Sequence, residues 1–282
     1  MLSHYLKNKL KRYRKEIRGA YIRLRYPFTR EELEASLRKL GMAPGDTVLV
    51  HSSFDQFGGF RGTAKDVILA LQAVVGMQGT LLMPTLPFTG TAVAYAALGK
   101  VFDVYKTSSS MGLISELFRR SPQVVRSVHP THSVAVWGVH AADIIRDHYL
   151  ARTPCGHDTP FDRLLQLKGK MLFLGMGIEV MTFFHTIEEQ LEPLMPFSPF
   201  TKETFCLRSK DQEGRILETK TRLFDPEISR RRNLRKLTPI LKSCDAWREG
   251  QIGYLKMILL QAEDVAAACL SMAEGGKYCY DF

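Results

Sequence analysis

The sequence predicts an α/β protein: a three-layer sandwich with a partly parallel central sheet, plus a C-terminal extension made of a β-hairpin and helices. Short apolar runs rich in β-branched residues alternate along the chain with segments whose apolar residues recur every three or four positions. This alternation is the pattern of strands connected by helices. The 282 residues, 45% of them apolar and 24% charged, are enough to build one large core.

The first segment of the sequence is strongly basic. Residues 1–30 contain ten Lys or Arg and a single acid, Glu16, and therefore carry +9 of the chain's net charge of +10. Apolar residues recur there at intervals of three and four, which predicts an amphipathic helix over residues 1–28. Residues 1–26 could contact an anionic membrane, but we favour packing of the apolar stripe on the body or on a second subunit, with the charges solvated. The stripe consists of Leu2, Leu6, Leu10, Tyr13, Ile17, Tyr21 and Leu24.

Residues 29–282 are expected to form a single domain. Thr29 to Glu32 has the form of a capping box that starts a helix, and Gly41 ends that helix. Two β-rich runs flank Gln212-Glu213-Gly214, and a basic stretch of helical period follows, so residues 200–245 are expected to be an insertion of a hairpin and a basic helix. The other expected elements are the strands Thr47–His51, Thr80–Met83, Val134–Trp137 and Lys170–Gly175, the helices Ala64–Val75, Met111–Arg120, Ala141–Tyr149 and Phe161–Leu167, and a final strand and helix within residues 254–272.

A polar, glycine-rich loop follows the first of these strands. The residues HSSFDQFGGFRGT join that strand to the helix that begins at Ala64. Such a loop presents free backbone N–H groups at the positive end of the helix dipole, which suits phosphates or an oxyanion. The alternative is that Gly62-Thr63 is only a turn and a helix N-cap.

The candidate catalytic groups gather between His129 and Glu188, a segment that contains six of the eight histidines. His185 and Glu188 are three positions apart in a predicted helix, so their side chains lie on one face. A carboxylate beside an imidazole fixes the tautomer of the ring and stabilises the imidazolium that forms when the ring takes a proton, as a general base requires. The alternative is a histidine that only bonds to a helical neighbour.

Two other chemistries are open in this segment. Cys155, in TPCGHD, could be a nucleophile activated by His157 or His148, or simply a small buried side chain. The five cysteines form no C-x-x-C pair, so we expect reduced thiols. A divalent metal for hydrolysis is the second possibility, although the spacing of the candidate ligands matches no known signature. Those candidates are His129, His132, His140, His148, His157 and Asp158.

Six blocks occur in order between about Leu33 and Glu192: LGMAPGDTVLVHSSFDQFGGFRGTAKDVILAL, GTLLMPT, SMGLISELFRRSPQVVRSVHPTHSVAVWG, GHDTPFDRLL, LFLGMG and MTFFHTIEE. Together they resemble the aminoglycoside 3-N-acetyltransferase family, and RSVHP with the final H-x-x-E is the most specific part. The resemblance implies an α/β enzyme that moves an acetyl or related acyl group from coenzyme A to an amine of an amino sugar. Acyl-coenzyme A would be its co-substrate, and no metal is implied.

The resemblance also implies roles for individual residues. His185 would be the catalytic base and Glu188 its partner, with backbone N–H groups near Ser52 or Ser127 as oxyanion donors. Two departures from the family pattern are Gly62-Thr63, where paired glycines are common, and Met181, where Asn is frequent. Contacts with coenzyme A would come from Ser52, Ser53, Phe54, Gly62, Thr63, Ser110, Met111, Ser127 and His129.

The acceptor is predicted from the charge that follows the site. An aminoglycoside is a polycation, whereas ten basic side chains follow the H-x-x-E block here. We therefore favour an anionic acceptor, a nucleotide-linked amino sugar of surface-polysaccharide synthesis, with an aminoglycoside antibiotic as the alternative. The expected acceptor contacts are His148, His157 and Asp158. The basic residues are Arg208, Lys210, Arg215, Lys220, Arg222, Arg230, Arg231, Arg232, Arg235 and Lys236.

Location and partners follow from the apolar and basic segments. No stretch approaches eighteen uninterrupted apolar residues, and no apolar signal core precedes a cleavage site, so we expect a cytoplasmic protein. Membrane association through the basic segment and a homo-oligomer are compatible with this, and we expect no nucleic-acid partner. A non-catalytic, membrane-associated binding protein is the remaining alternative.

Overall fold

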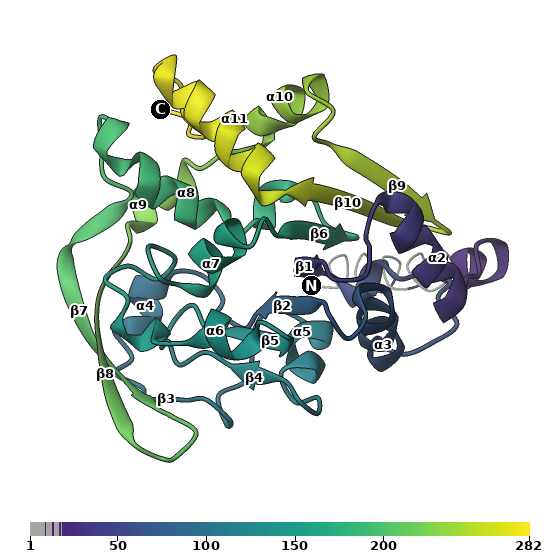
Figure 1. Ribbon diagram of the computed structural model, residues 1–282, viewed down its shortest axis with the longest axis horizontal. Coiled ribbons are helices and arrows are strands. Elements are labelled where there is room, and N and C mark those ends of the chain that lie inside the picture. Colours follow the sequence, from purple (N-terminus) through teal and green to yellow (C-terminus); the bar gives the residue numbers. More distant parts are fainter. Residues whose placement is uncertain (1–8, 10–12, 14–16, 18) are drawn as a thin grey trace.

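A seven-stranded mixed sheet forms the centre of the computed structural model, which describes residues 9, 13, 17 and 19–282 (Figure 1). The strand order is β4-β5-β2-β1-β6-β10-β9. Strand β1 pairs in parallel with β2 and β6, and the four remaining neighbouring pairs are antiparallel. The predicted α/β class with a partly parallel sheet is therefore confirmed. The strands are β1 Thr47–Ser52, β2 Thr80–Pro84, β4 Val125–Arg126, β5 Val134–Gly138, β6 Lys170–Leu174, β9 Arg248–Ile252 and β10 Leu255–Gln261.

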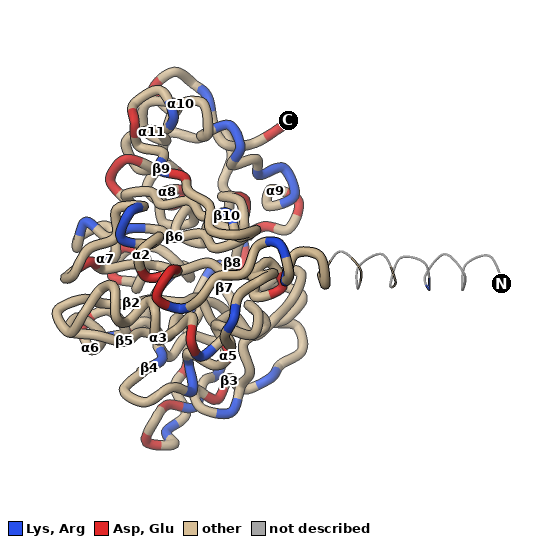
Figure 2. The backbone as a smooth tube through the Cα atoms, turned by 90° about the vertical axis from the view of Figure 1, so that its right-hand side faces the viewer, with Lys and Arg blue, Asp and Glu red and all other residues tan. Residues whose placement is uncertain are grey.

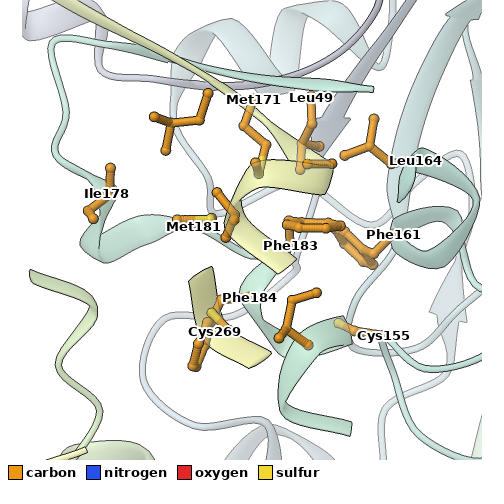
Figure 3. Packing of buried hydrophobic residues seen from close by; sticks show 14 of the residues in the cluster. Leu49, Cys155, Phe161, Leu164, Met171, Ile178, Met181, Phe183, Phe184 and Cys269 are labelled. Atoms are coloured by element: carbon orange, nitrogen blue, oxygen red, sulfur yellow. The ribbon is translucent and has the colours of Figure 1, made fainter. Parts of the chain in front are cut away.

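Helices cover both faces of this sheet, because alternate side chains of each central strand are apolar on both sides. In β1, Val48 and Val50 join one buried cluster and Leu49 joins the other, which Figure 3 shows from close by. On the Val48 face lie α2 Arg30–Leu40, α3 Ala64–Val75 and α5 Leu113–Phe118. On the Leu49 face lie α6 Ala141–Ile145, α7 Pro160–Gln166, α8 Phe184–Leu191, α10 Leu237–Ser243 and α11 Ala262–Glu274.

A smaller sheet contains the predicted hairpin. Its order is β3-β7-β8, with β7 and β8 antiparallel and joined through Gly214, whose φ of 84° is left-handed. Figure 1 shows this hairpin as a long arc beside the main body. The strands are β3 Phe102–Asp103, β7 Phe200–Lys210 and β8 Ile216–Phe224. The remaining helices are α4 Ala92–Ala96, α9 Pro226–Arg230 and the short 3-10 helices Phe54–Gln56, His148–Leu150, Ile178–Val180, Glu192–Leu194 and Leu234–Lys236.

Three predicted helices are shorter than the sequence indicates. The helix expected over Met111–Arg120 is reduced to α5, Leu113–Phe118. The helix expected over Ala141–Tyr149 ends at Ile145, because Asp147 takes a left-handed φ of 56°. The basic helix expected after the hairpin is broken between α9 and α10. There the backbone pairs with the C-terminal tail: the Asn233 N–H donates to the Cys279 carbonyl at 2.7 Å, and the Asp281 N–H donates to the Arg231 carbonyl at 2.8 Å.

Most of the predicted helix over residues 1–28 lies outside the described residues. Residues 19–25 are helical. The described members of the predicted stripe, Tyr13, Ile17, Tyr21 and Leu24, are all exposed, so these four do not pack on the body. Packing on a second subunit, the other half of the favoured alternative, stays a prediction. Ile22 is buried instead, against Gly58. The division of the chain at residue 28 stays a prediction. Among the described residues, no helix combines the length and apolar character needed to cross a bilayer.

Candidate active site

His185 is held at the edge of the core by the first turn of α8. The chain leaves β6 through Gly175, where a φ of 69° and the side chain of Gln56 leave no room for a Cβ. The buried Phe183 and Phe184 then anchor the start of α8 in the cluster of Figure 3. The side chain of His185 follows directly and remains 17% exposed.

His185 and Glu188 form the pair that their spacing predicts. His185 Nδ1 lies 2.5 Å from Glu188 Oε2. The Glu188 side chain is fully buried. Its other oxygen, Oε1, accepts hydrogen bonds from Arg232 Nε at 2.9 Å and from the Tyr280 hydroxyl, and forms an ion pair with Arg232 in which Nη2 lies at 2.8 Å. A buried carboxylate thus has a cation and two further donors as partners, as a buried charge requires.

These contacts determine the protonation state of the imidazole. Burial lowers the pKa of His185, and the nearby Arg232 cation lowers it further, while Glu188 opposes both effects. An ionised carboxylate can only accept hydrogen bonds, so Nδ1 carries the proton that is shared with Glu188. His185 is therefore a neutral imidazole near pH 7 whose Nε2 lone pair is free to accept a proton.

A line of aromatic rings continues from His185 into the core. Phe224 of β8 stacks on the His185 ring at a centroid distance of 4.1 Å, and the His132 ring meets it edge-on at 6.0 Å. The ring centroids of His132 and His129 are 6.2 Å apart, and the His129 ring stacks on the His148 ring at a centroid distance of 4.5 Å. Burial lowers the pKa of His148 to about 4 and those of His129 and His132 well below the ordinary value. These three rings are neutral at pH 7.

The side chains of Ser127, His129 and His148 are all buried, and their predicted contacts with coenzyme A or the acceptor stay a prediction. The Ser127 hydroxyl accepts from the Val134 N–H and donates to His148 Nδ1, both at 2.9 Å. His148 Nε2 donates to the Pro154 carbonyl at 2.9 Å. His129 Nδ1 accepts from the His132 N–H at 3.1 Å, and its Nε2 has no partner among the described residues. These side chains therefore shape the wall behind the site.

The loop predicted to hold coenzyme A lies at the carboxyl end of β1. Ser52 Oγ is buried there without a partner in the described part of the chain. Ser53 and Phe54 follow, and a cleft of about 940 Å³ opens beside them, lined by Gln56, Gly175 to Gly177 and the β9–β10 hairpin. Gly112, which follows Ser110 and Met111, approaches the Ser52 carbonyl, so both predicted cofactor segments meet at this sheet edge.

Gly62 and Thr63 lie further along the same loop and are exposed. Thr63 is the N-cap of α3 and forms a capping box with Asp66. Of the two alternatives for this loop, the Thr63 side chain therefore has the role of a helix N-cap. The Ser53 N–H donates to the Leu174 carbonyl and the Ser127 N–H to the Val134 carbonyl, so neither is free as the expected oxyanion donor.

The predicted acceptor residues His157 and Asp158 share an open cleft of about 430 Å³. Their side chains are 82% and 70% exposed. Glu189, the neighbour of Glu188 in α8, lines the same cleft and accepts a hydrogen bond from the Thr153 hydroxyl. Burial raises the pKa of Glu189. Sequence reasoning overlooked Glu189, although the doubled acid at positions 188 and 189 is a visible signal.

The two alternative chemistries find little support among the described residues. The only group of three potential metal ligands there consists of the exposed His157 and Asp158 and the buried Asp162, and the other histidines proposed as ligands do not join it. Cys155 is buried, and burial raises the pKa of its thiol well above the ordinary value, as do the charges of the two adjacent glutamates of α8. A neutral thiol enclosed by the apolar side chains of Figure 3 is a poor nucleophile.

The basic residues that follow the site are mostly paired. Figure 2 shows basic and acidic segments next to each other around α9. Six of the ten form ion pairs, which reduces the surplus of positive charge on which the anionic acceptor was predicted. The pairs are Arg215 with Asp211, Arg222 with Glu192, Arg230 with Glu227, Arg232 with Glu188, Arg235 with Glu179 and Lys236 with Asp281.

Known proteins with this fold share the sequence pattern. Residues 49–274 match the family described as aminoglycoside 3-N-acetyltransferase. The aminoglycoside N(3)-acetyltransferase IV of a Salmonella species is 30% identical over 247 residues, which cover 88% of each chain. The chain belongs to the aminoglycoside 3-N-acetyltransferase family. The aminoglycoside N(3')-acetyltransferase-like protein YokD of Bacillus subtilis is 32% identical over 182 residues, which span 59% of this chain but only 66% of YokD.

Solved structures of the family agree with this assignment. A histidine-to-alanine variant of AAC(3)-IVa in complex with a gentamicin superposes with a TM-score of 0.73 at 27% identity, covering 89% of this chain and 90% of that one. AAC(3)-Xa superposes with a TM-score of 0.77 at 25% identity, covering 92% of this chain and 98% of AAC(3)-Xa. The predicted family and the acyltransferase class are thus confirmed at the level of the family. The coenzyme A co-substrate is confirmed at the same level, since AAC-IIIb has been solved with coenzyme A.

Acidification should destabilise this protein through its buried histidines. Burial lowers the pKa of His148 to about 4 and that of His51 to about 3. Both rings bind a proton in the unfolded chain near pH 6.5 but stay neutral in the folded protein until well below that pH. The contribution of these two neutral rings to the free energy of unfolding is therefore complete above pH 6.5. As the pH decreases below 6.5, the free energy of unfolding decreases by up to about 1.4 kcal/mol per pH unit for each ring. Urea unfolding between pH 7.5 and 4.5 measures this slope.

His148→Gln should make the slope shallower, whereas His140→Gln, at a histidine that is only partly buried, should leave it unchanged. An equal slope in His148→Gln and the wild type would contradict the assignment.

Proposed function

We propose that this protein transfers an acetyl group from acetyl-coenzyme A to an amine of an aminoglycoside-type amino sugar, with His185 as the general base. The observation that carries the proposal is the bond between His185 Nδ1 and the fully buried Glu188. It leaves Nε2 as the one basic nitrogen of a ring that is neutral and partly exposed.

The proposed reaction is a direct transfer. As the acceptor nitrogen attacks the thioester carbonyl, His185 Nε2 takes the proton that the nitrogen loses, and Glu188 stabilises the imidazolium. The new C–N bond forms, the C–S bond breaks, and the departing thiolate recovers the proton from His185. Ser52 Oγ, a buried hydroxyl without a partner among the described residues, supports a coenzyme A site at the end of β1.

His185→Ala should remove most of the turnover, because the variant loses the partly exposed Nε2 that takes the proton. We expect kcat/KM to fall by about 10²–10⁴, the usual contribution of general base catalysis, while calorimetric titration with coenzyme A gives an unchanged affinity. His140→Ala, in the same segment but outside the contacts of His185 and Glu188, is the control. Wild-type turnover by His185→Ala would refute the base assignment.

The acceptor proposal rests on relatives and on charge. AAC(3)-IVa, 27% identical here, has been solved with a gentamicin. In this chain most of the basic residues near the site are paired with acids. The cleft around His157 offers the carboxyl groups of Asp147, Asp158 and Glu189 to an ammonium group. Arg146, Arg152 and Arg163 also line this cleft. Arg146 forms an ion pair with Asp143, and Arg163 points to the carbonyls of Asp143, Ile144 and Arg146, to which it donates.

An acceptor panel tests this proposal directly. Release of free coenzyme A thiol should be fastest with gentamicin-like and apramycin-like amines and should be absent with nucleotide-linked amino sugars. Glu189→Gln should raise KM for the aminoglycoside more than it lowers kcat, because a binding carboxylate would be lost. Turnover of nucleotide-linked amino sugars alone would restore the anionic acceptor.

We also propose that the basic N-terminal segment contacts an anionic membrane surface. Tyr13, Ile17, Tyr21 and Leu24 recur at helical spacing, and they are 53%, 69%, 58% and 85% exposed. The segment's charge of +9 over residues 1–30 opposes pairing with a second copy of itself, and aliphatic side chains add nothing to phosphate recognition in nucleic acids. Apolar and basic groups together suit anionic lipid headgroups.

Co-sedimentation with vesicles checks this proposal. The protein should bind phosphatidylglycerol-containing vesicles and not pure phosphatidylcholine vesicles. Tyr21→Ser with Leu24→Ser should weaken binding severalfold, whereas Leu270→Ser, an exposed leucine of α11, should not. If the protein does not bind vesicles, the membrane proposal is wrong. Self-association in light scattering would then indicate a second copy of the chain as the partner, and binding of an oligonucleotide would indicate a nucleic acid.

A further inference from the structure

The C-terminal tail reaches back to the carboxylate of the candidate active site. Tyr280 lies beyond residues 49–274, the part of the chain that matches the family. Its side chain is buried, and its hydroxyl donates to Glu188 Oε1. Arg232 donates to the same oxygen through Nε and forms an ion pair with it. Three segments that are far apart in the sequence therefore meet at one carboxylate.

The backbone holds Tyr280 and Arg232 in register. They face each other across an isolated antiparallel bridge, which places their side chains on the same side. On both sides of this bridge the tail is fixed: Asn233 bonds to the Cys279 carbonyl at 2.7 Å, and Asp281 accepts from Asn233 Nδ2 and Lys236 Nζ, both at 2.8 Å. The tail is thus an ordered part of the site.

We propose that Tyr280 and Arg232 are positioning residues that set the basicity of His185 by holding Glu188. This inference rests on the proposed role of His185 as the base. With both donors on Oε1, the carboxylate cannot rotate, and Oε2 is left for His185 Nδ1. The two donors also withdraw negative charge from the oxygen that faces the imidazole. A carboxylate that is less attractive to the imidazolium keeps His185 neutral, and so competent as a base, at lower pH.

Other groups around the pair can also influence this balance. His132 faces the His185 ring edge-on, and the Arg232 cation lies within reach of both members of the pair. The titratable groups packed near Glu188 are Glu189 on the same helix and the buried thiols Cys155, Cys269 and Cys279. These groups remain in place when only the Tyr280 hydroxyl is removed, so that change isolates the contribution of the tail.

The test compares two tyrosines of the same tail. Tyr280→Phe removes the hydroxyl that bonds to Glu188, and Tyr278→Phe removes one that donates to the Leu194 carbonyl instead. In Tyr280→Phe the acid limb of kcat/KM against pH should move upward by roughly 0.5–1 pH unit, because Glu188 then binds the His185 proton more strongly. The KM for acetyl-coenzyme A should not change. Tyr278→Phe should keep the wild-type profile.

A direct titration supplies a readout that does not depend on activity. NMR of labelled imidazole nitrogens, with His185→Ala to assign the signal, should show the same upward shift of the His185 pKa in Tyr280→Phe. Arg232→Gln, which removes the cation, should raise this pKa further.

Two results would overturn the inference: an unmoved pH profile in Tyr280→Phe, or a loss of activity that is equal at every pH, as purely structural damage would give. If His185→Ala is inactive while Tyr280→Phe is unmoved, only the role of the tail fails. If His185→Ala retains full activity, the proposed function fails first.

Discussion

The charge of Glu188 is the constraint on which the site depends. Moving a carboxylate out of water costs on the order of several kcal/mol unless charged and hydrogen-bonding partners replace the solvent. Here the replacements come from α8 itself, from the segment between α9 and α10, and from the C-terminal tail. The break in the basic helix after the hairpin follows from the same requirement, because residues 231–233 must pair with the tail to bring Arg232 to the carboxylate.

The charge pattern shows why position along the chain is a poor guide to electrostatics near a site. Ten basic residues between Arg208 and Lys236 look like a surface for an anion when they are read in sequence. Their acidic partners are distant in several cases: Glu179 for Arg235, Glu188 for Arg232 and Asp281 for Lys236. The fold converts much of the basic run into ion pairs that hold the α9–α10 segment in place, and this weakens the reason to favour a nucleotide-linked acceptor.

Local features of the sequence were sufficient for much of the fold. The capping box at Thr29, the helix Ala64–Val75 and the strand that begins at Thr47 follow from caps and apolar periodicity, and all are present. The pair His185 and Glu188 follows from a spacing of three in a helix. By contrast, the edge strand β9, Arg248–Ile252, has too polar a sequence to be recognised. The burial of Ser127, His129 and His148 depends on packing between segments, which periodicity does not contain.

Local contacts determine that a base is present in the site, whereas distant contacts determine the pKa of that base. An H-x-x-E motif places an imidazole beside a carboxylate wherever a helix forms, so the motif alone predicts the tautomer of His185. How strongly the imidazole holds a proton depends on what else binds the carboxylate, and in this chain those partners lie 44 and 92 positions away from Glu188. Two chains that share the motif but differ in this tail would therefore have the same base with a different pKa.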